Sequence, residues 1–169
     1  ILGGTWDNYD WEYRKEFVRD LFYAANTFYQ VEKRERLSLA EEHTINESAL
    51  CKIIGLTIET RPDYCNKPEY IKSYIELGVT RVQYGVQSIY DDVLKLIKRG
   101  CKHKDTVEAT KMIHDSCFKD IINIMPILPY PNQYDDGMHT CVEKDEAMFD
   151  YLMESEDCLA DEWKIYPTS

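Results

Sequence analysis

The chain has 169 residues, of which 44% are hydrophobic and 30% charged, as expected for one globular domain with a sizeable core. No stretch approaches the roughly 20 apolar residues of a membrane span, and the first residues do not resemble a signal peptide, so we expect no membrane association. The formal net charge is −11. Eleven acids and one base between Asp135 and Glu162 contribute −10 of it. Because acids repel nucleic acid, any nucleic-acid contact should lie elsewhere.

In chain order, the hydrophobic pattern predicts strands that alternate with helices. The expected elements are a strand at 1–2, a helix at 10–29, a polar helix-prone stretch at 32–49, a strand at 53–58, a helix at 67–77, a strand at 79–86, helices at 90–98 and 106–117, a strand at 121–125, a loop at 130–137, a helix at 142–153 and a strand at 163–166. This alternation indicates an α/β fold with parallel strands. Since the chain lacks GxGxxG and GxxxxGK[ST], a partial (β/α) TIM-type barrel is favoured over a doubly wound sheet.

Polar or conformationally special residues follow each predicted strand. They are Gly3-Gly4-Thr5, Glu59-Thr60-Arg61, Gln87-Ser88, Met125-Pro126 and Tyr166-Pro167-Thr168. Because the carboxyl ends of parallel strands meet at one edge of a sheet, we expect these residues to share one face. Parallel α/β enzymes hold their active sites at that face.

Each candidate at this face allows a functional and a structural interpretation. Gly3 and Gly4 suit the close approach of a carboxylate or an amino-acid backbone, or a plain tight turn. Glu59 suits hydroxyls or an amine, or a salt bridge. Gln87 suits ribose hydroxyls, or a capping turn into the next helix. Asn123 interrupts an apolar strand, and a buried amide requires polar partners.

One basic cluster follows the strand end at Gln87. It comprises Lys95, Lys98, Arg99, Lys102, His103 and Lys104. The cluster suits phosphates near an active site, or it is a solvated helix end whose cations favour the helix dipole. Its four lysines are therefore the candidates for contact with phosphate groups.

The six cysteines and four histidines form no known metal-binding motif. The chain contains no CxxC, no HExxH and no GxSxG. The cysteines are therefore predicted to be reduced packing residues of a cytoplasmic protein, with the nucleus as the alternative compartment. Cys65 is the exception to examine, because it follows a predicted strand end.

Together these motifs closely resemble the radical-SAM domain of the catalytic subunit of the Elongator complex. The resemblance is carried by Gly3-Gly4-Thr5, by GLTIETRPDYC from Gly55 to Cys65, by TRVQYGVQSIYDDV from Thr80 to Val93, by Arg99-Gly100, by MPILP from Met125 to Pro129 and by KIYPT from Lys164 to Thr168. Their order and spacing agree with that family along nearly the whole chain. The ETRPDYC and GVQS-Y-DDV runs are specific to it, whereas GGT, GVQS and LP also occur in wider radical-SAM relatives.

This resemblance implies a partial TIM-type barrel that binds S-adenosylmethionine beside a [4Fe-4S] cluster. In the family an acetyltransferase domain follows, and the whole enzyme uses acetyl-CoA to modify carbon 5 of the tRNA wobble uridine. Its partners would be tRNA, with Lys95, Lys98, Lys102 and Lys104 as the possible contacts, and other Elongator-type subunits. The implied cofactor-binding residues are Gly3, Gly4, Thr5, Glu59, Gln87, Arg99 and Asn123.

By analogy with these relatives, Gly4 and Thr5 would face the methionine part of the ligand. Glu59, Gln87 and Arg99 would lie near its amino, ribose and carboxylate groups, and Asn123 near the ribose. An amide and a carboxylate suit hydroxyls, and a guanidinium suits a carboxylate. The sequence assigns no catalytic residue.

The chain also departs from the family. The cysteine motif for the cluster would lie upstream of Ile1, the acetyltransferase domain is absent, and Cys101 follows Arg99-Gly100 where the family usually has His. We therefore expect residues 1–169 to be a single partial barrel domain from a longer protein, inactive by itself, with a divergent acidic segment at 130–161. The alternatives are another coproporphyrinogen-oxidase-like radical-SAM enzyme, or a degenerate barrel that binds tRNA or protein without catalysis.

Overall fold

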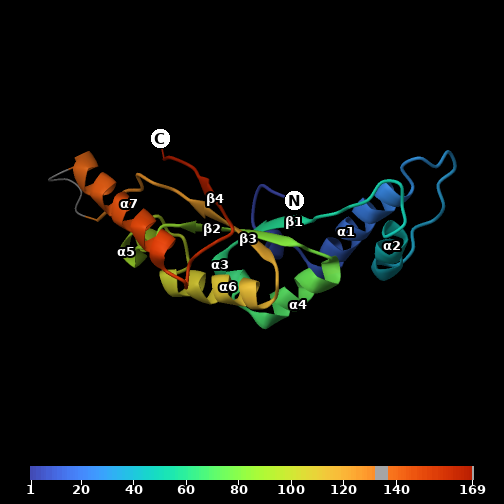
Figure 1. Cartoon of the computed structure of the whole chain (residues 1–169), viewed down its shortest axis with the longest axis horizontal. Coiled ribbons are helices and arrows are strands. Elements are labelled where there is room, and N and C mark those ends of the chain that lie inside the picture. Colours follow the sequence, from blue (N-terminus) through green and yellow to red (C-terminus); the bar gives the residue numbers. More distant parts are fainter. Residues whose placement is uncertain (132–136, 169) are drawn as a thin grey trace.

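The computed structural model describes residues 1–131 and 137–168 of the chain (Figure 1). Its sheet has four parallel strands in the order β1-β2-β3-β4. The strands are β1 (Thr57–Thr60), β2 (Arg81–Gln87), β3 (Lys119–Ile124) and β4 (Glu162–Ile165). The strand order follows the chain without the reversal that marks a doubly wound sheet. The predicted arc of a (β/α) barrel with parallel strands is therefore confirmed.

The helices leave one face of the sheet uncovered. They are η1 (Trp6–Asn8), α1 (Trp11–Asn26), α2 (Leu39–Asn46), α3 (Pro62–Cys65), α4 (Pro68–Leu77), α5 (Asp91–Leu96), α6 (His103–Asp115) and α7 (Gly137–Glu154). In Figure 1, α3, α4 and α6 lie beneath the sheet, α1 with α2 and α5 with α7 lie at its two ends, and both termini lie on the opposite side. We call that opposite side the open face.

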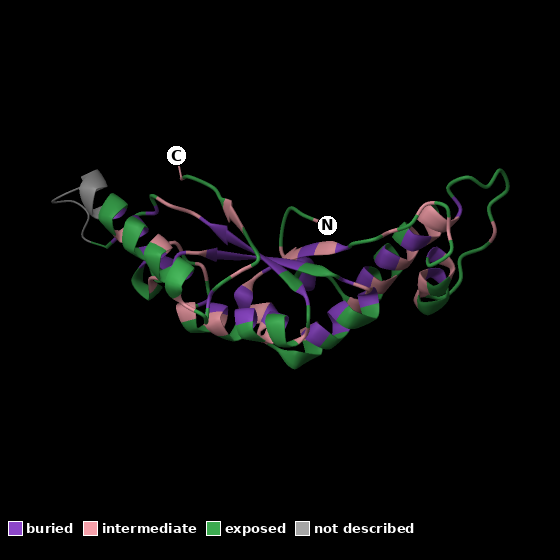
Figure 2. Ribbon diagram, viewed as in Figure 1, coloured by how far each residue is buried: buried purple, intermediate pink, exposed green. Residues whose placement is uncertain are grey.

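The core lies between the sheet and the helices beneath it. Strand residues that point towards the helices, such as Ile58, Val82 and Ile122, are at most 1% exposed, and they pack with Tyr74 and Ile113. Figure 2 shows the same division, with buried strands in the middle and exposed outer sides on the helices. Since side chains alternate along a strand, residues on either side of these positions must point to the open face.

The ends of the elements follow local chemistry. Helix α4 begins at a proline and ends at Gly78, whose φ of +71° is a left-handed conformation that favours glycine. The polar stretch predicted at 32–49 is helical only from Leu39, because Ser38 and Glu41 form a capping box there. The short helix α3, which begins at Pro62, was not predicted from the sequence.

Two predicted strands differ from those observed. The strand expected at 53–58 begins only at Thr57, and Ile54 is 92% exposed, because pairing with β2 starts at Arg81. The pair Ile1-Leu2 is no strand, although the carbonyl of Ile1 accepts a hydrogen bond from the N–H of Glu59 at 3.1 Å. The first residues therefore lie alongside β1.

Helix α7 carries much of the acidic segment. It starts at Gly137 rather than at the predicted residue 142, and residues 132–136 of the predicted loop, with Asp135 and Asp136, lie outside the described part. Met148 and Leu152 are fully buried, so the helix covers the core with its apolar side. Among the described residues, no helix is both long and apolar enough to cross a membrane.

Candidate functional site

A polar network crosses the open face of the sheet from β4 to β1. Lys164 Nζ donates to Gln83 Oε1 at 2.7 Å, and Gln83 Nε2 donates to Asn123 Oδ1 at 2.9 Å. Asn123 Nδ2 donates to Glu59 Oε1 at 3.3 Å, and the N–H of Gly3 donates to Glu59 Oε2 at 2.7 Å. We call these five residues the open-face network. It joins three predicted candidates, Gly3, Glu59 and Asn123.

The strand register explains why these side chains meet. Glu59 pairs with Gln83 across β1 and β2, whereas Asn123 lies between Gly85 and Lys164. Because Gly85 has no side chain, Asn123 can reach past β2 towards Glu59. Gln83 and Asn123 are only 2% and 5% exposed, so each amide needs the partners that it has.

The segment Gly3-Gly4-Thr5 borders a cavity beside this network. Gly3 has a φ of +110°, and beyond the adjacent residues no atom lies within 4 Å of where a Cβ would be at Gly3 or Gly4. The cavity has a volume of about 460 Å³, and its lining includes this segment together with Trp6 and Tyr9. The backbone of Gly3 and Gly4 is therefore exposed at this cavity.

Arg99 and Gln87 meet over Gly85 at the carboxyl end of β2. The guanidinium of Arg99 donates from Nη2 to the carbonyl of Gly85 at 3.0 Å. A Cβ on Gly85 would lie 2.4 Å from Arg99 Nη2 and 2.4 Å from Gln87 Nε2, which is too close for any real contact. Because residue 85 has no side chain, both polar groups can lie where they are observed, and we call this arrangement the Gly85 cradle.

The backbone around the cradle is unusual. The pairing between β2 and β3 shifts register between Gly85 and Gln87, and Gln87 has a φ of +66°. A bulge with a non-glycine residue in the left-handed region is costly, and such strain gathers at functional sites. The bulge re-aims the side chain of Gln87 at the end of the strand.

Two atoms of the cradle are buried and have no hydrogen-bond partner in the described structure. They are Gln87 Oε1 and Arg99 Nε. Buried polar atoms nearly always have partners, and a ligand with a donor for Gln87 and an acceptor for Arg99 would satisfy both atoms. Burial also lowers the pKa of the Arg99 guanidinium below its usual value, and an anionic group there would favour the charged form.

The ETRPDYC motif supports the cradle from the side. Arg61 Nε and Nη2 bind the carboxylate of Asp63 at 2.8 and 3.0 Å. Gly100 has a φ of +79°, and a Cβ on it would lie 2.9 Å from Arg61 Nη2. The two motifs therefore pack together through Arg61 and Gly100, next to Arg99. Cys65 is fully buried and its burial raises the pKa of the thiol, as expected of a packing residue.

The structure brings three of the four candidate lysines together. Lys95, Lys98 and Lys102, which we call the cavity lysines, line a cavity of about 670 Å³ together with Asp91 and Asp92. Lys104 is not part of this lining, and its ammonium lies 3.3 Å from Glu108. Arg99, from the same predicted basic cluster, instead turns back to Gly85.

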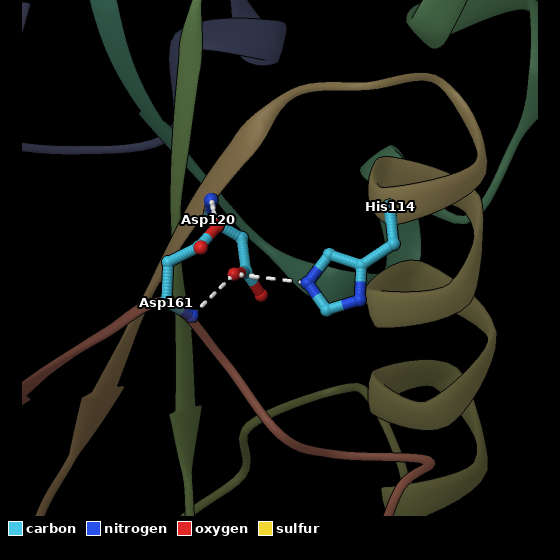
Figure 3. A group of neighbouring side chains, drawn as sticks. All are labelled: His114, Asp120 and Asp161. Atoms are coloured by element: carbon cyan, nitrogen blue, oxygen red, sulfur yellow. Dashed lines mark hydrogen bonds and ion pairs between the residues drawn. The ribbon is translucent and has the colours of Figure 1, made fainter.

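One group outside the open face has the composition of a metal site. His114, Asp120 and Asp161 each place a ligand atom within 4.8 Å of the others (Figure 3). Asp120 accepts hydrogen bonds from His114 Nε2 and the N–H of Asp161, and Asp161 accepts from Lys119 and the N–H of Asp120. Because these donors already satisfy the carboxylates, we interpret the group as a clasp that ties the start of β3 to the start of β4.

The described residues do not fit a [4Fe-4S] cluster, which requires at least three neighbouring cysteine thiolates. Among them, the His114 group is the one set of three His, Cys, Asp or Glu residues close enough for a shared ion, and it contains no cysteine. S-adenosylmethionine fits better, because its hydroxyls and carboxylate are the donor and acceptor that the Gly85 cradle lacks.

Sequence reasoning missed three residues of this face. Gln83 interrupts an apolar strand, which is the same signal that identified Asn123, and it should have been found in that way. Gly85 and Lys164 lie in runs that carry the resemblance but were assigned no role, because their roles depend on Arg99 and Gln83 in the folded chain.

Comparisons with known proteins identify the family of this chain. The sequence profile of the radical SAM superfamily matches residues 11–138. A tRNA uridine(34) acetyltransferase of Methanocaldococcus infernus is 40% identical over 167 residues, and Elongator complex protein 3 of Homo sapiens is 34% identical over 173 residues. Each alignment covers 99% of this chain but 28% of the relative, so the chain spans less than a third of their length.

Solved structures give the same result. The archaeal Elp3 of Methanocaldococcus infernus, with residues 1-46 deleted, superposes with a TM-score of 0.86 at 39% identity, covering 99% of this chain and 36% of that one. Coproporphyrinogen III oxidase of Escherichia coli, a radical SAM enzyme, superposes with a TM-score of 0.56 over 79% of this chain and 29% of its own. At 14% identity the second match shows the fold alone. The chain described here belongs to the radical SAM superfamily.

Proposed function

We propose that this chain is the S-adenosylmethionine-binding part of an Elongator-like enzyme that modifies carbon 5 of the tRNA wobble uridine with acetyl-CoA. The names of the relatives, which align along 99% of this chain, support the reaction class. The Gly85 cradle is the observation that carries the proposal. It offers an unpaired buried acceptor and an unpaired buried donor at the carboxyl end of β2.

Each site residue would contact a different part of the cofactor. Arg99 would bind the carboxylate, because Nε is free and a guanidinium binds carboxylates by charge-assisted hydrogen bonds. Gln87 Oε1 would accept a hydrogen bond from a ribose hydroxyl. Glu59 would hold the ammonium group, with Asn123 beside the ribose. When bound beside a reduced cluster, S-adenosylmethionine supplies a carbon-centred radical.

The segment Gly3-Gly4-Thr5 would face the methionine part of the cofactor through its accessible backbone. The cavity lysines would contact the phosphates of tRNA, since they lie together on the surface that follows β2. Lys104 is a weaker candidate, because it lies outside the lining of their cavity and is paired with Glu108.

The remaining parts of the reaction depend on groups outside the described residues. The cluster ligands, the acetyl-CoA site and any Elongator-type subunits would belong to the rest of the protein or to its partners. We treat residues 1–169 as one partial domain with a divergent segment at 130–161, and we expect the protein in the cytoplasm or nucleus.

The test uses the complete natural protein, reconstituted anaerobically with iron and sulfide. We expect it to bind S-adenosylmethionine, to form 5′-deoxyadenosine and to modify the wobble uridine when tRNA and acetyl-CoA are present. Gln87→Ala and Glu59→Ala should weaken S-adenosylmethionine binding in isothermal titration without unfolding the protein. Binding of tRNA without any binding of S-adenosylmethionine would instead indicate a degenerate, non-catalytic barrel.

A further inference from the structure

We propose that Lys164 is a positioning residue that fixes the carboxylate of Glu59 from three strands away, through Gln83 and Asn123. The side chains of the open-face network form one continuous chain of hydrogen bonds between these two ends. The inference rests on the proposed function only for the identity of the ligand that Glu59 holds.

The two end groups, the Lys164 ammonium and the Glu59 carboxylate, fix the donor-to-acceptor direction of this series of hydrogen bonds. An ammonium group can only donate, so Gln83 must turn Oε1 towards Lys164 and Nε2 towards Asn123. A carboxylate can only accept, so Asn123 must turn Nδ2 towards Glu59 and Oδ1 towards Gln83. Both ends therefore require the same orientation of the two buried amides, and the observed bonds have that orientation.

Burial makes the arrangement rigid. Gln83 and Asn123 are 2% and 5% exposed, so neither amide can exchange its protein partner freely for water. Without Lys164, the buried Oε1 of Gln83 has no hydrogen-bond donor. The amide of Gln83 can then rotate to find another partner, which breaks its bond to Asn123. Asn123 would then hold the Glu59 carboxylate less firmly. The hydrogen bond from the N–H of Gly3 would be the remaining bond of the network to that carboxylate.

The consequence for binding is a weaker hold on the group that Glu59 contacts. If the variant loses the equivalent of one hydrogen bond that orders Glu59, the affinity for the ligand should fall about three- to tenfold. Lys164→Arg keeps a cationic donor at the same place in β4 and should restore the affinity. If Lys164 instead contacted the ligand directly, replacing it would not have to change Asn123 in the ligand-free protein.

The first measurement is made without a ligand, on the complete natural protein carrying ¹⁵N in its asparagine and glutamine side chains. We expect Lys164→Met to shift the NH₂ signals of both Gln83 and Asn123, and Lys164→Arg to return them. Lys164→Gln, a smaller change, gives the same comparison if the methionine variant does not fold. A shift at Gln83 with an unmoved Asn123 signal would overturn the proposal.

The second measurement is the affinity for S-adenosylmethionine of the same variants. Lys164→Met should bind about three to ten times more weakly than the wild type, whereas Lys111→Met, at an exposed position on α6, should bind equally well. An unchanged affinity despite shifted amides would refute the positioning role. If the amides respond and the wild type does not bind S-adenosylmethionine, the proposed function fails and the coupling stands.

Discussion

Adding one methyl group at Gly85 tests the cradle directly. The Cβ of Gly85→Ala would lie 2.4 Å from Arg99 Nη2 and from Gln87 Nε2, about 1 Å closer than the 3.4 Å at which ordinary contact begins. Both groups must therefore move away, and Arg99 loses its bond to the carbonyl of Gly85. A displaced Arg99 should also lose its proposed hydrogen bond to the cofactor's carboxylate. A hydrogen bond to a charged group contributes about 1.5–3 kcal/mol, so S-adenosylmethionine should bind roughly 10 to 150 times more weakly.

The assay is isothermal titration of the complete protein with S-adenosylmethionine, together with thermal unfolding. Gly55→Ala is the matched control, because its Cβ would lie 3.4 Å from Thr80 Oγ1, an ordinary contact. We expect the control to bind normally. A folded Gly85→Ala protein with unchanged affinity would show that Arg99 and Gln87 do not form the cofactor site.

Three further predictions concern other parts of the molecule. The bonds from Arg34 hold the pKa of the buried Glu42 carboxyl at about 2 against the usual 4.5, a difference of about 3 kcal/mol at most. This stabilisation should be present above pH 4.5 and fade as the pH falls towards 2, so urea unfolding of Glu42→Gln should differ from wild type at pH 7 and approach it in acid. Replacing the cavity lysines with alanine should weaken tRNA binding and reduce its salt dependence, whereas Lys104→Ala should do neither; equal losses in filter binding would contradict this. Zinc or a chelator should leave the melting temperature unchanged if the His114 group is a clasp, and a rise with zinc would make it a metal site.

The sequence predicted the parts of the site that depend on local pattern. Strand ends at Glu59 and Gln87 follow from apolar runs that break into polar residues, and Asn123 stands out in an apolar strand. The start of β1 could not be predicted, because Ile53, Ile54 and Leu56 are as apolar as a strand, but the register pairs with β2 begin only at Thr57. The Gly85 cradle was hidden for a similar reason: Arg99 comes from a loop fourteen residues further along the chain.

The clasp between Asp120 and Asp161 lies at the opposite end of the sheet from the candidate binding site. It binds β3 to β4 where both strands begin, whereas Glu59 and Gln87 lie where β1 and β2 finish. The carboxylates of the clasp are satisfied by protein donors, and the polar atoms of the cradle are not. One end of the barrel arc can therefore hold the sheet together while substitutions at the other end change what it binds, so that selection for a new substrate does not have to act against the integrity of the fold.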